Sequence, residues 1–286
     1  MTTYLVTGAS GLVGQAILHR LASRGRAVGT ALRHGGGQLH TVDLRDRAAV
    51  KKLLDEVKPD AVVHAAANPD PDSCEDKPAE ARRLNVDSTR WLRELLPAHA
   101  TLALISTDYV FDGSSAPYRE TDPVHAINVY GQTKVEAEAV LAGRPHSLVV
   151  RIPLQVGPPP ASGKAGFIAQ MWTQLNDPRP AAVDDVLVRV PTWTADVANA
   201  LEFLLTRHAS GTYHVSSPHA GTRWYWTQEL ARLRDRSTAH LTPSTAVIPR
   251  RAARPVDGKL ITDKLRTLGW DRYTPFADMV KALGLR

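Results

Sequence analysis

The sequence predicts an α/β fold in which a doubly wound parallel sheet is followed by a smaller C-terminal lobe. Short runs of β-branched and apolar residues alternate with helical patterns from the first residues to about residue 152. This alternation is typical of a parallel sheet covered by helices on both faces. With 286 residues and 43% hydrophobic content, the chain is long enough to bury such a sheet and to add a lobe.

The individual elements follow from the spacing of the apolar residues. We expect strands at residues 4–7, 27–32, 39–42, 61–64, 101–106 and 147–152. Apolar positions three or four apart predict helices at 12–23, 50–57 and 78–96, and another that begins near residue 130. In an open parallel sheet ligands bind beyond the carboxyl ends of the strands, so the residues that follow these strands are the first candidates for a site.

The pattern changes after residue 152. Loops rich in proline and glycine, such as residues 157–163, separate shorter elements, among them a helix at 195–205 and a strand at 212–216. We therefore expect a first domain over residues 1–152 and a second lobe over 153–286. Residues 183–205 are expected to return to the main sheet.

Composition narrows the classes of protein. A single cysteine, Cys74, excludes an internal disulfide and fits a reducing compartment, so we expect a cytoplasmic location. Acidic neighbours should keep its thiol protonated and inert. The start of the chain does not resemble a secretory signal, and no apolar stretch is long enough to span a membrane. The eleven histidines are scattered, without the spacing of a metal site.

The net charge of +6 is spread along the chain. Basic residues alternate with acidic ones, and the densest basic cluster, Arg250, Arg251 and Arg254, is too short to follow a nucleic-acid backbone. The charge therefore favours a solvated surface with one cleft for an anion over a nucleic-acid interface.

A glycine turn follows the first expected strand. Gly8, Gly11 and Gly14 lie between this strand and an amphipathic helix, which is the context that makes the motif informative. The glycines permit a tight turn, a close approach of the backbone to a pyrophosphate, and close packing of helix on strand. The sequence therefore predicts a Rossmann-type dinucleotide site, and we place the cofactor against Gly8, Ser10, Gly11, Leu12, Val13 and Gly14.

The end of the second strand indicates which dinucleotide binds. An NAD site usually has Asp or Glu there to bind the ribose 2′-hydroxyl, whereas this chain has Arg33 and His34. A guanidinium pairs with a 2′-phosphate that a carboxylate would repel. NADP(H) is therefore favoured over NAD(H).

Tyr130 and Lys134 are four residues apart and share one face of a helix. An ammonium beside a phenol favours the phenolate, so we expect Lys134 to move the pKa of Tyr130 toward the working range. Tyr130 can then give a proton to a carbonyl oxygen. Thr107 follows the apolar strand at 101–106, and its hydroxyl is expected to bind the same carbonyl.

These motifs together resemble the extended short-chain dehydrogenase/reductase superfamily over essentially the whole chain. The matching segments are residues 7–14, 64–67, 85–88, 106–113 and 130–134. Within the superfamily, residues 106–113, 211–216 and 254–264 resemble dTDP-4-dehydrorhamnose reductases. Residues 151–154, 189–192 and 196–198 are more similar to the regulatory β-subunit of methionine adenosyltransferase.

The resemblance implies roles for particular residues. Thr107, Tyr130 and Lys134 would form the catalytic trio. Contacts on the adenine and ribose side would come from Asp43, Leu44, Ala65, Ala66 and Ala67, and Ile152 is also placed at the cofactor. The candidates for the substrate are Asp108, Tyr109, Arg189, Arg223 and Arg254. The acidic segment 70–76 either covers the mouth of the cleft or is a solvated loop.

The leading interpretation is an NADPH-dependent reductase of a nucleotide-linked 4-keto-6-deoxysugar. The first alternative is a non-catalytic NADP-binding regulatory subunit that contacts a partner enzyme through its second half. The second alternative is a nucleotide-sugar epimerase or dehydratase, in which the hydride returns to the substrate. A homodimer is compatible with each of these.

Overall fold

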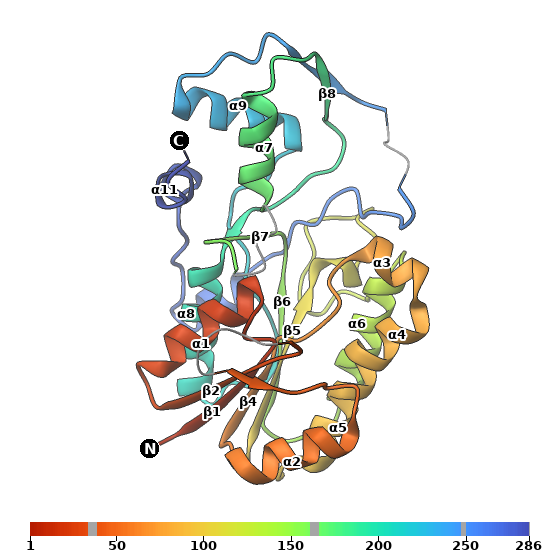
Figure 1. Ribbon diagram of the computed structural model, residues 1–286, viewed down its shortest axis with the longest axis vertical. Coiled ribbons are helices and arrows are strands. Elements are labelled where there is room, and N and C mark those ends of the chain that lie inside the picture. The colour runs from red at the N-terminus through yellow and green to blue at the C-terminus, as the bar shows by residue number, and fades with distance from the viewer. Residues whose placement is uncertain (34–38, 161–165, 247–249, 286) are drawn as a thin grey trace.

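The computed structural model of the protein describes residues 1–33, 39–160, 166–246 and 250–285. Its centre is a seven-stranded sheet in the order β10-β6-β5-β4-β1-β2-β3 (Figure 1). All six pairs of neighbouring strands are parallel. The strands are β1 (Thr3–Thr7), β2 (Arg26–Ala31), β3 (Leu39–Thr41), β4 (Ala61–His64), β5 (Thr101–Thr107), β6 (Ser147–Ile152) and β10 (Gly211–His214). The predicted Rossmann-type fold is confirmed.

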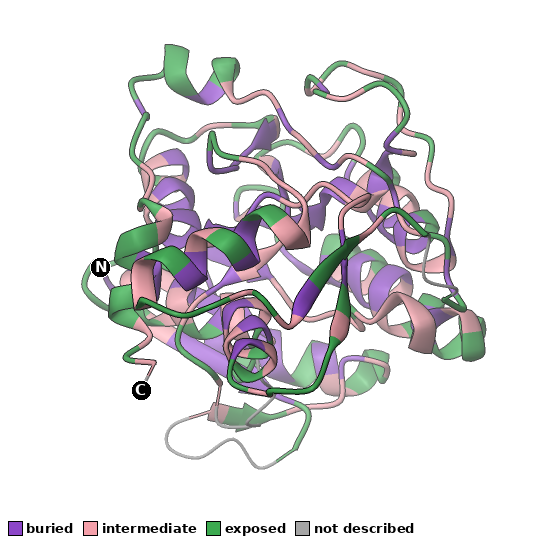
Figure 2. Ribbon diagram, turned by 90° about the horizontal axis from the view of Figure 1, so that it is seen from above, coloured by how far each residue is buried: buried purple, intermediate pink, exposed green. Residues whose placement is uncertain are grey.

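Helices cover both faces of this sheet. Because side chains alternate along a strand, neighbouring residues such as Leu5 and Val6 enter different cores. The core on one face includes residues of α1 (Leu12–Ala22) and α8 (Thr194–Thr206). The other core includes residues of α2 (Arg47–Val57), α5 (Ser88–Leu95) and α6 (Val129–Val140). Figure 2 shows the buried strands of the sheet between these partly exposed helices.

The segment expected as one helix at 78–96 is divided. It forms α4 (Pro78–Arg82), a π-helical turn (Arg83–Asp87) and α5, and a short helix α3 (Pro71–Asp76) precedes it. The wide turn contains Asn85, whose side chain accepts a hydrogen bond from the backbone of Asn68 at 2.8 Å and donates one to Thr133 Oγ1 at 2.9 Å. A π-turn at such a polar junction is typical of functional regions.

The second half forms a lobe with a core of its own. The lobe contains α7 (Phe167–Leu175), α9 (Arg223–Arg234) and α11 (Phe276–Ala282), which contribute to one hydrophobic cluster. It also contains the paired strands β8 (Ala181–Asp184) and β11 (Leu241–Ser244), and the pair β7 (Gln155–Val156) and β9 (Thr192–Trp193). The short helix α10 (Asp263–Thr267) precedes α11 and contacts β10.

The return of the chain to the main sheet differs from the expectation for residues 183–205. Val183 stays in the lobe, in β8, because β8 pairs with β11. Residues 194–206 do return, as the helix α8 that packs on α1. The strand that joins the sheet is β10, beside β6, so residues assigned to the lobe complete the sheet edge. No described helix has the length and apolar character needed to cross a membrane.

Candidate active site

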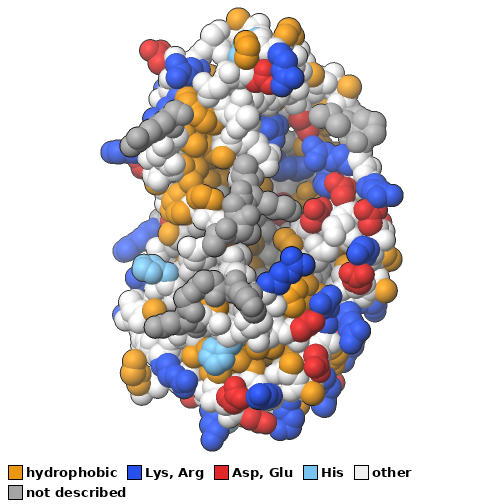
Figure 3. Space-filling view, in the orientation of Figure 1, with side chains coloured by type: hydrophobic (Ala, Val, Ile, Leu, Met, Phe, Trp, Pro, Cys, Tyr) orange, Lys and Arg blue, Asp and Glu red, His pale blue; other side chains and the backbone are white. Residues whose placement is uncertain are grey.

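A cavity of about 600 Å³ lies beyond the carboxyl ends of the strands, between the sheet and the lobe. Figure 3 shows the molecule hollowed there, with Lys and Arg side chains beside the hollow. The cavity brings together most of the residues expected at the site. They are Gly8, Ser10, Gly11, Leu12, Val13, Gly14, Leu44, Ala65, Ala66, Ala67, Thr107, Asp108, Tyr109, Tyr130, Lys134, Ile152 and Arg189.

The glycine turn fits closely into its surroundings. Gly8 has a φ of +68°, and a β-carbon there would lie 2.7 Å from the Cα of Ala66. A β-carbon at Gly14 would collide with the carbonyl of Gly8. Helix α1 begins directly after Gly11, and no side chain caps its first amides. These amides and the helix dipole are therefore available to an anion, as a dinucleotide pyrophosphate requires.

The buried His64, on β4, links β1 to the first residue of α5. Its Nδ1 lies 2.7 Å from the hydroxyl of Thr7 and its Nε2 2.9 Å from the hydroxyl of Ser88. Because Ser88 donates its own proton to the carbonyl of Leu84, the Nε2 of His64 carries the hydrogen. Burial, followed by the charge of Lys134, lowers the pKa of His64 to about 3, so it stays neutral.

Helix α6 carries Tyr130 and Lys134, and its first turn is held by two side chains. Asn128 accepts a hydrogen bond from the backbone of Gly131 at 2.8 Å. Glu75, from α3, accepts one from the backbone of Val129, also at 2.8 Å. Both satisfy amides that a helix leaves free, and a carboxylate at this end also suits the helix dipole. The position of Tyr130 is therefore fixed from outside its own helix.

The environment of Tyr130 differs from the expectation. Burial raises the pKa of Tyr130, and the influence that lowers it is a hydrogen bond with Thr107. The positive charge of Lys134 does not bring this pKa down, because removal of the phenol from water outweighs it. Tyr130 is therefore a neutral phenol at neutral pH, which is the form that can donate a proton.

Lys134 lies about one turn after Tyr130 on α6 and is only 2% exposed. Burial lowers the pKa of Lys134 to about 8, against the charge of Glu138, which raises it. Within the described part of the chain no side chain or carbonyl hydrogen-bonds this ammonium, although it lines the cavity. A buried ammonium without a partner is costly, so the site suits a ligand with acceptors such as ribose hydroxyls.

Thr107 and Asp108 form a buried polar pair at the end of β5. The hydroxyl of Thr107 donates to Oδ1 of Asp108 at 3.0 Å and accepts from the backbone of Tyr109 at 3.2 Å. Burial raises the pKa of Asp108 to about 6, although nearby Arg189 and Thr107 lower it. The proton of Thr107 is thus directed to Asp108 here, and the expected contact with a substrate carbonyl requires the hydroxyl to rotate.

Not every expected cofactor residue lines the cavity. The carboxylate of Asp43 instead accepts hydrogen bonds from Nε and Nη2 of Arg45, at 2.9 and 2.8 Å. These bonds lower the pKa of Asp43. Arg33 is exposed after β2, and His34 lies outside the described residues. Residues that sequence reasoning did not include also line the cavity, among them Thr30, Leu32, Val42, Leu84, Leu154 and Gln155. Most are apolar side chains next to predicted positions, and no motif marked them.

The three arginines proposed for the substrate have different surroundings. Arg189 lines the cavity and donates to the carbonyl of Pro255 at 3.2 Å. Arg223 begins α9, over the ring of Phe167. Arg254 is paired with Asp72 at 2.8 Å, with 9% of its side chain exposed. The guanidinium of Arg254 is thus already paired with a carboxylate of the chain, and its role at the substrate stays a prediction.

The acidic segment 70–76 is not a solvated loop. It forms α3, which Asp70 caps through the backbone of Asp72 and Ser73. Two of its acids contact the second half of the chain, since Asp72 pairs with Arg254 and Asp76 with Arg251. Cys74 is buried within it, and burial, with the neighbouring acids, raises the pKa of its thiol to about 11. The thiol is therefore protonated, as predicted.

Comparison with known proteins confirms the resemblance seen in the motifs. The chain is 38% identical to dTDP-4-dehydrorhamnose reductase from Streptomyces griseus over 262 residues, covering 88% of this chain and 83% of the relative. It is 34% identical to methionine adenosyltransferase 2 subunit beta from Pongo abelii over 285 residues, covering 97% of this chain and 85% of the relative.

Solved structures of dTDP-4-dehydrorhamnose reductases share the fold. A dTDP-4-dehydrorhamnose reductase structure from Clostridium acetobutylicum superimposes with a TM-score of 0.86 at 26% identity, covering 98% of this chain and 97% of the other. The reductase from Bacillus anthracis, solved in complex with NADP, gives a TM-score of 0.87 at 22% identity, covering 99% of each chain. The model of the RmlD substrate binding domain matches residues 1–284, and the chain therefore belongs to that family.

Proposed function

We propose that this protein is an NADPH-dependent carbonyl reductase whose substrate is a nucleotide-linked 4-keto-6-deoxysugar. The observation that carries the proposal is the convergence of Thr107, Tyr130 and Lys134 with the glycine turn on one cavity. The relative named dTDP-4-dehydrorhamnose reductase, at 38% identity, supports the substrate class. The chemistry is reduction of a ketone to an alcohol.

The residues present fit a nicotinamide dinucleotide. The uncapped start of α1 suits the pyrophosphate, and the unpartnered ammonium of Lys134 suits a ribose. Ala65, Ala66 and Ala67 leave room beside the turn because their side chains are small. We assign the 2′-phosphate of NADP(H) to Arg33, which is exposed after β2 and so free to reach it.

The bound dinucleotide supplies the hydride, and the chain supplies the proton and the geometry. Tyr130 donates its phenolic proton to the carbonyl oxygen as that oxygen becomes negative. The nearby charge of Lys134 then stabilises the phenolate that remains. Thr107 hydrogen-bonds the phenol and so helps to orient it. A positioned acid of this kind contributes about 10² to 10⁴ in rate.

We assign the diphosphate of the substrate to Arg189, Arg223 and Arg250. Burial, followed by the charge of Arg250, lowers the pKa of Arg223. None of the ion pairs between described residues includes these three arginines. Burial raises the pKa of Tyr109, which lines the cavity, and the charges of Arg189 and Arg250 both lower it. The charge of Asp184 raises the pKa of Arg223, but the two form no ion pair among the described residues. Neighbouring cations favour an anion with several oxygens.

The test is to mix the purified protein with NADPH and dTDP-4-dehydrorhamnose and to follow the loss of NADPH absorbance. We expect stoichiometric oxidation and formation of the sugar alcohol. Tyr130→Phe should bind NADPH as the wild type does while kcat falls at least about 100-fold. Absence of NADPH oxidation with every dTDP-4-keto-6-deoxysugar tried would contradict the proposal. Return of the hydride without net oxidation would instead indicate an epimerase or dehydratase.

A regulatory subunit is the second candidate, and one observation favours it. The adenosyltransferase β-subunit matches 97% of this chain at 34% identity, a longer match than that of the Streptomyces griseus reductase. On this alternative the protein binds NADP(H) and associates with a methionine adenosyltransferase. Size-exclusion chromatography with that enzyme, run beside the turnover assay, separates the two: a stable complex and no turnover would favour the regulatory role.

A further inference from the structure

Residues 252–258, here called the closing segment, run from the second half of the chain back to the catalytic domain. The segment lies directly behind two cavity residues. Arg189 donates to its Pro255 carbonyl at 3.2 Å. A β-carbon at Gly258 would collide with the carboxylate of Asp108, so the backbone of the segment is in contact with that group. The segment therefore supports two residues that line the cavity, although its own residues are not among those that line it.

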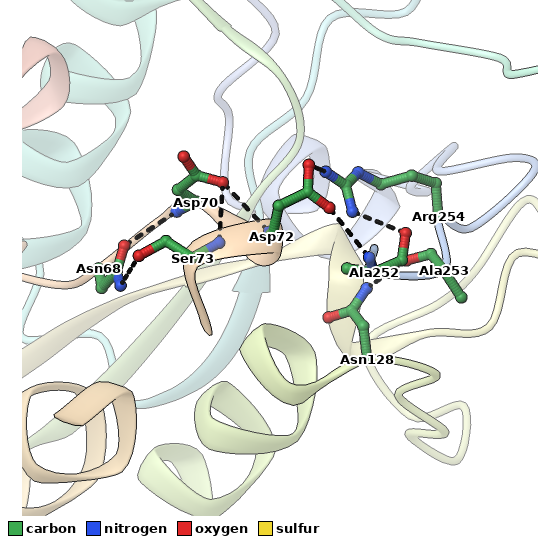
Figure 4. Close-up of polar contacts among 8 residues, drawn as sticks. All are labelled: Asn68, Asp70, Asp72, Ser73, Asn128, Ala252, Ala253 and Arg254. Carbon is green, nitrogen blue, oxygen red and sulfur yellow. Dashed lines mark hydrogen bonds and ion pairs between the residues drawn. The ribbon is translucent and has the colours of Figure 1, made fainter. Parts of the chain in front are cut away.

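An ion pair fastens the beginning of the closing segment to α3. The two oxygens of Asp72 accept from the backbone of Ala252 at 2.9 Å and from Nη2 of Arg254 at 2.8 Å. Arg254 also donates to the carbonyl of Ala252 at 2.8 Å, which shapes the turn between them. Figure 4 shows these contacts meeting at Asp72. The side chain of Arg254 is 9% exposed and that of Asp72 is 39% exposed, so solvent reaches one partner of the pair.

A second contact joins the closing segment to the helix that carries Tyr130. The amide nitrogen of Asn128 donates to the carbonyl of Ala253 at 2.8 Å (Figure 4). The amide oxygen of the same residue caps α6 at Gly131. One buried side chain thus bonds both the closing segment and the first turn of the catalytic helix, two residues before Tyr130.

We propose that Asp72, Asn128 and Arg254 are positioning residues that fasten the closing segment and hold it in register with Tyr130, Asp108 and Arg189. The inference rests on the proposed reductase function, because it assigns the substrate side of that site to this junction. The dinucleotide turn at Gly8–Gly14 lies on other elements. Loss of the junction therefore acts on the substrate and on turnover, not on NADPH binding.

The test uses variants that cut single contacts in the full-length protein. Asp72→Asn removes the charge opposite Arg254 but keeps an acceptor for Ala252. Asn128→Asp keeps the cap on α6 but places an oxygen against the carbonyl of Ala253. We expect each to raise the KM for dTDP-4-dehydrorhamnose or lower kcat by at least about 10-fold, the effect of losing a charged or buried hydrogen bond. The Kd for NADPH should stay within about twofold. Asp72→Glu, which restores the charge, should recover part of the loss.

The matched control is the ion pair between Asp76 and Arg251, which joins α3 to the residue just before the closing segment, with 70% and 38% of the Arg251 and Asp76 side chains exposed. Asp76→Asn should leave both kinetic constants at the wild-type value. Hydrogen exchange of a peptide covering residues 250–258, measured without substrate, should accelerate in Asp72→Asn and not in Asp76→Asn. Faster exchange with unchanged kinetics would overturn the positioning role. If the wild type has no turnover, the affinity for dTDP replaces the kinetics, and equal affinity in wild type and Asp72→Asn would overturn it.

Discussion

At the scale of single residues, the site contains groups whose ionisation has been shifted by burial. The pKa of Lys134 is lowered and that of Tyr130 raised, and both changes favour the neutral form. A protein retains such groups at a cost in stability where their chemistry is needed. The sequence predicted these residues but not the direction of the shift in Tyr130, because burial is a property of the fold.

The shifted pKa of Lys134 predicts an alkaline limit to turnover. The pKa is about 8 in the folded protein, below its ordinary value, so the ammonium loses its proton as pH rises through about 8. We expect kcat/KM to fall above that pH, because a neutral amine cannot stabilise the phenolate. Lys134→Arg keeps its charge to much higher pH and should shift or remove this limb, although at lower activity. A limb at the same pH in Lys134→Arg would assign it to another group.

Arg33 should determine the preference between the two dinucleotides. Its guanidinium is exposed and no carboxylate precedes it at the end of β2. Arg33→Ala is expected to weaken the binding of NADPH by about 1 to 3 kcal/mol, the value of a charged hydrogen bond, and to leave the binding of NADH nearly unchanged. Titration of protein fluorescence with each cofactor measures both. If the ratio of the two affinities stays the same, the 2′-phosphate is read elsewhere.

At the scale of elements, the sequence predicted strands better than junctions. β4 and β6 begin and end where the apolar runs do, because a buried parallel strand needs an uninterrupted apolar run. The expected helix at 78–96 was wrong in its continuity. Its π-turn is set by contacts of Asn85 with Asn68 and Thr133, which lie on other elements. In the same way, the capping of α6 by Glu75 could not be read from the sequence.

The close packing of α1 on the glycine turn predicts that adding a methyl group at Gly14 destabilises the protein. A β-carbon at Gly14 would collide with the backbone of Gly8, so α1 must move away from the turn in Gly14→Ala. Overpacking of this kind costs about 1 to 3 kcal/mol, and the shift should also weaken NADPH binding. Urea unfolding and cofactor titration check the two effects. Gln15→Ala is the control, because it changes an exposed residue of the same helix, next to Gly14.

At the scale of the whole molecule, the two halves are joined by polar contacts that no local pattern reveals. Glu202 on α8 pairs with Arg20 and Arg24 at α1, at 3.0 and 2.8 Å. The closing segment makes a similar connection at α3. Neither contact could be predicted, because no spacing rule links partners that are more than a hundred residues apart in the sequence. Sequence patterns therefore predicted the cofactor half in detail and left the form of the substrate half open.

A buried ion pair lies near the β10 edge of the sheet, and we expect its removal to lower the free energy of unfolding. Arg151 on β6 donates to Glu138 on α6 at 2.7 Å, with 6% and 11% of the two side chains exposed. Ser106 donates to the same carboxylate, and His214 on β10 lies 3.5 Å from Arg151. The pair and these two contacts thus join α6 to the strands β5, β6 and β10.

Removal of Arg151 alone leaves the carboxylate of Glu138 buried without its counter-charge. We expect Arg151→Met to lower the free energy of unfolding by about 3 to 5 kcal/mol, and a double variant with Glu138→Leu to recover part of this loss, since the carboxylate that lost its counter-charge is then removed as well. Urea unfolding of the wild type, the two single variants and the double variant gives the coupling between the sites. Lys51→Met, in an exposed pair with Asp55, is the control and should change little. Additive losses in the double variant would show that the two side chains act independently, and the sheet edge would then owe its stability to apolar packing.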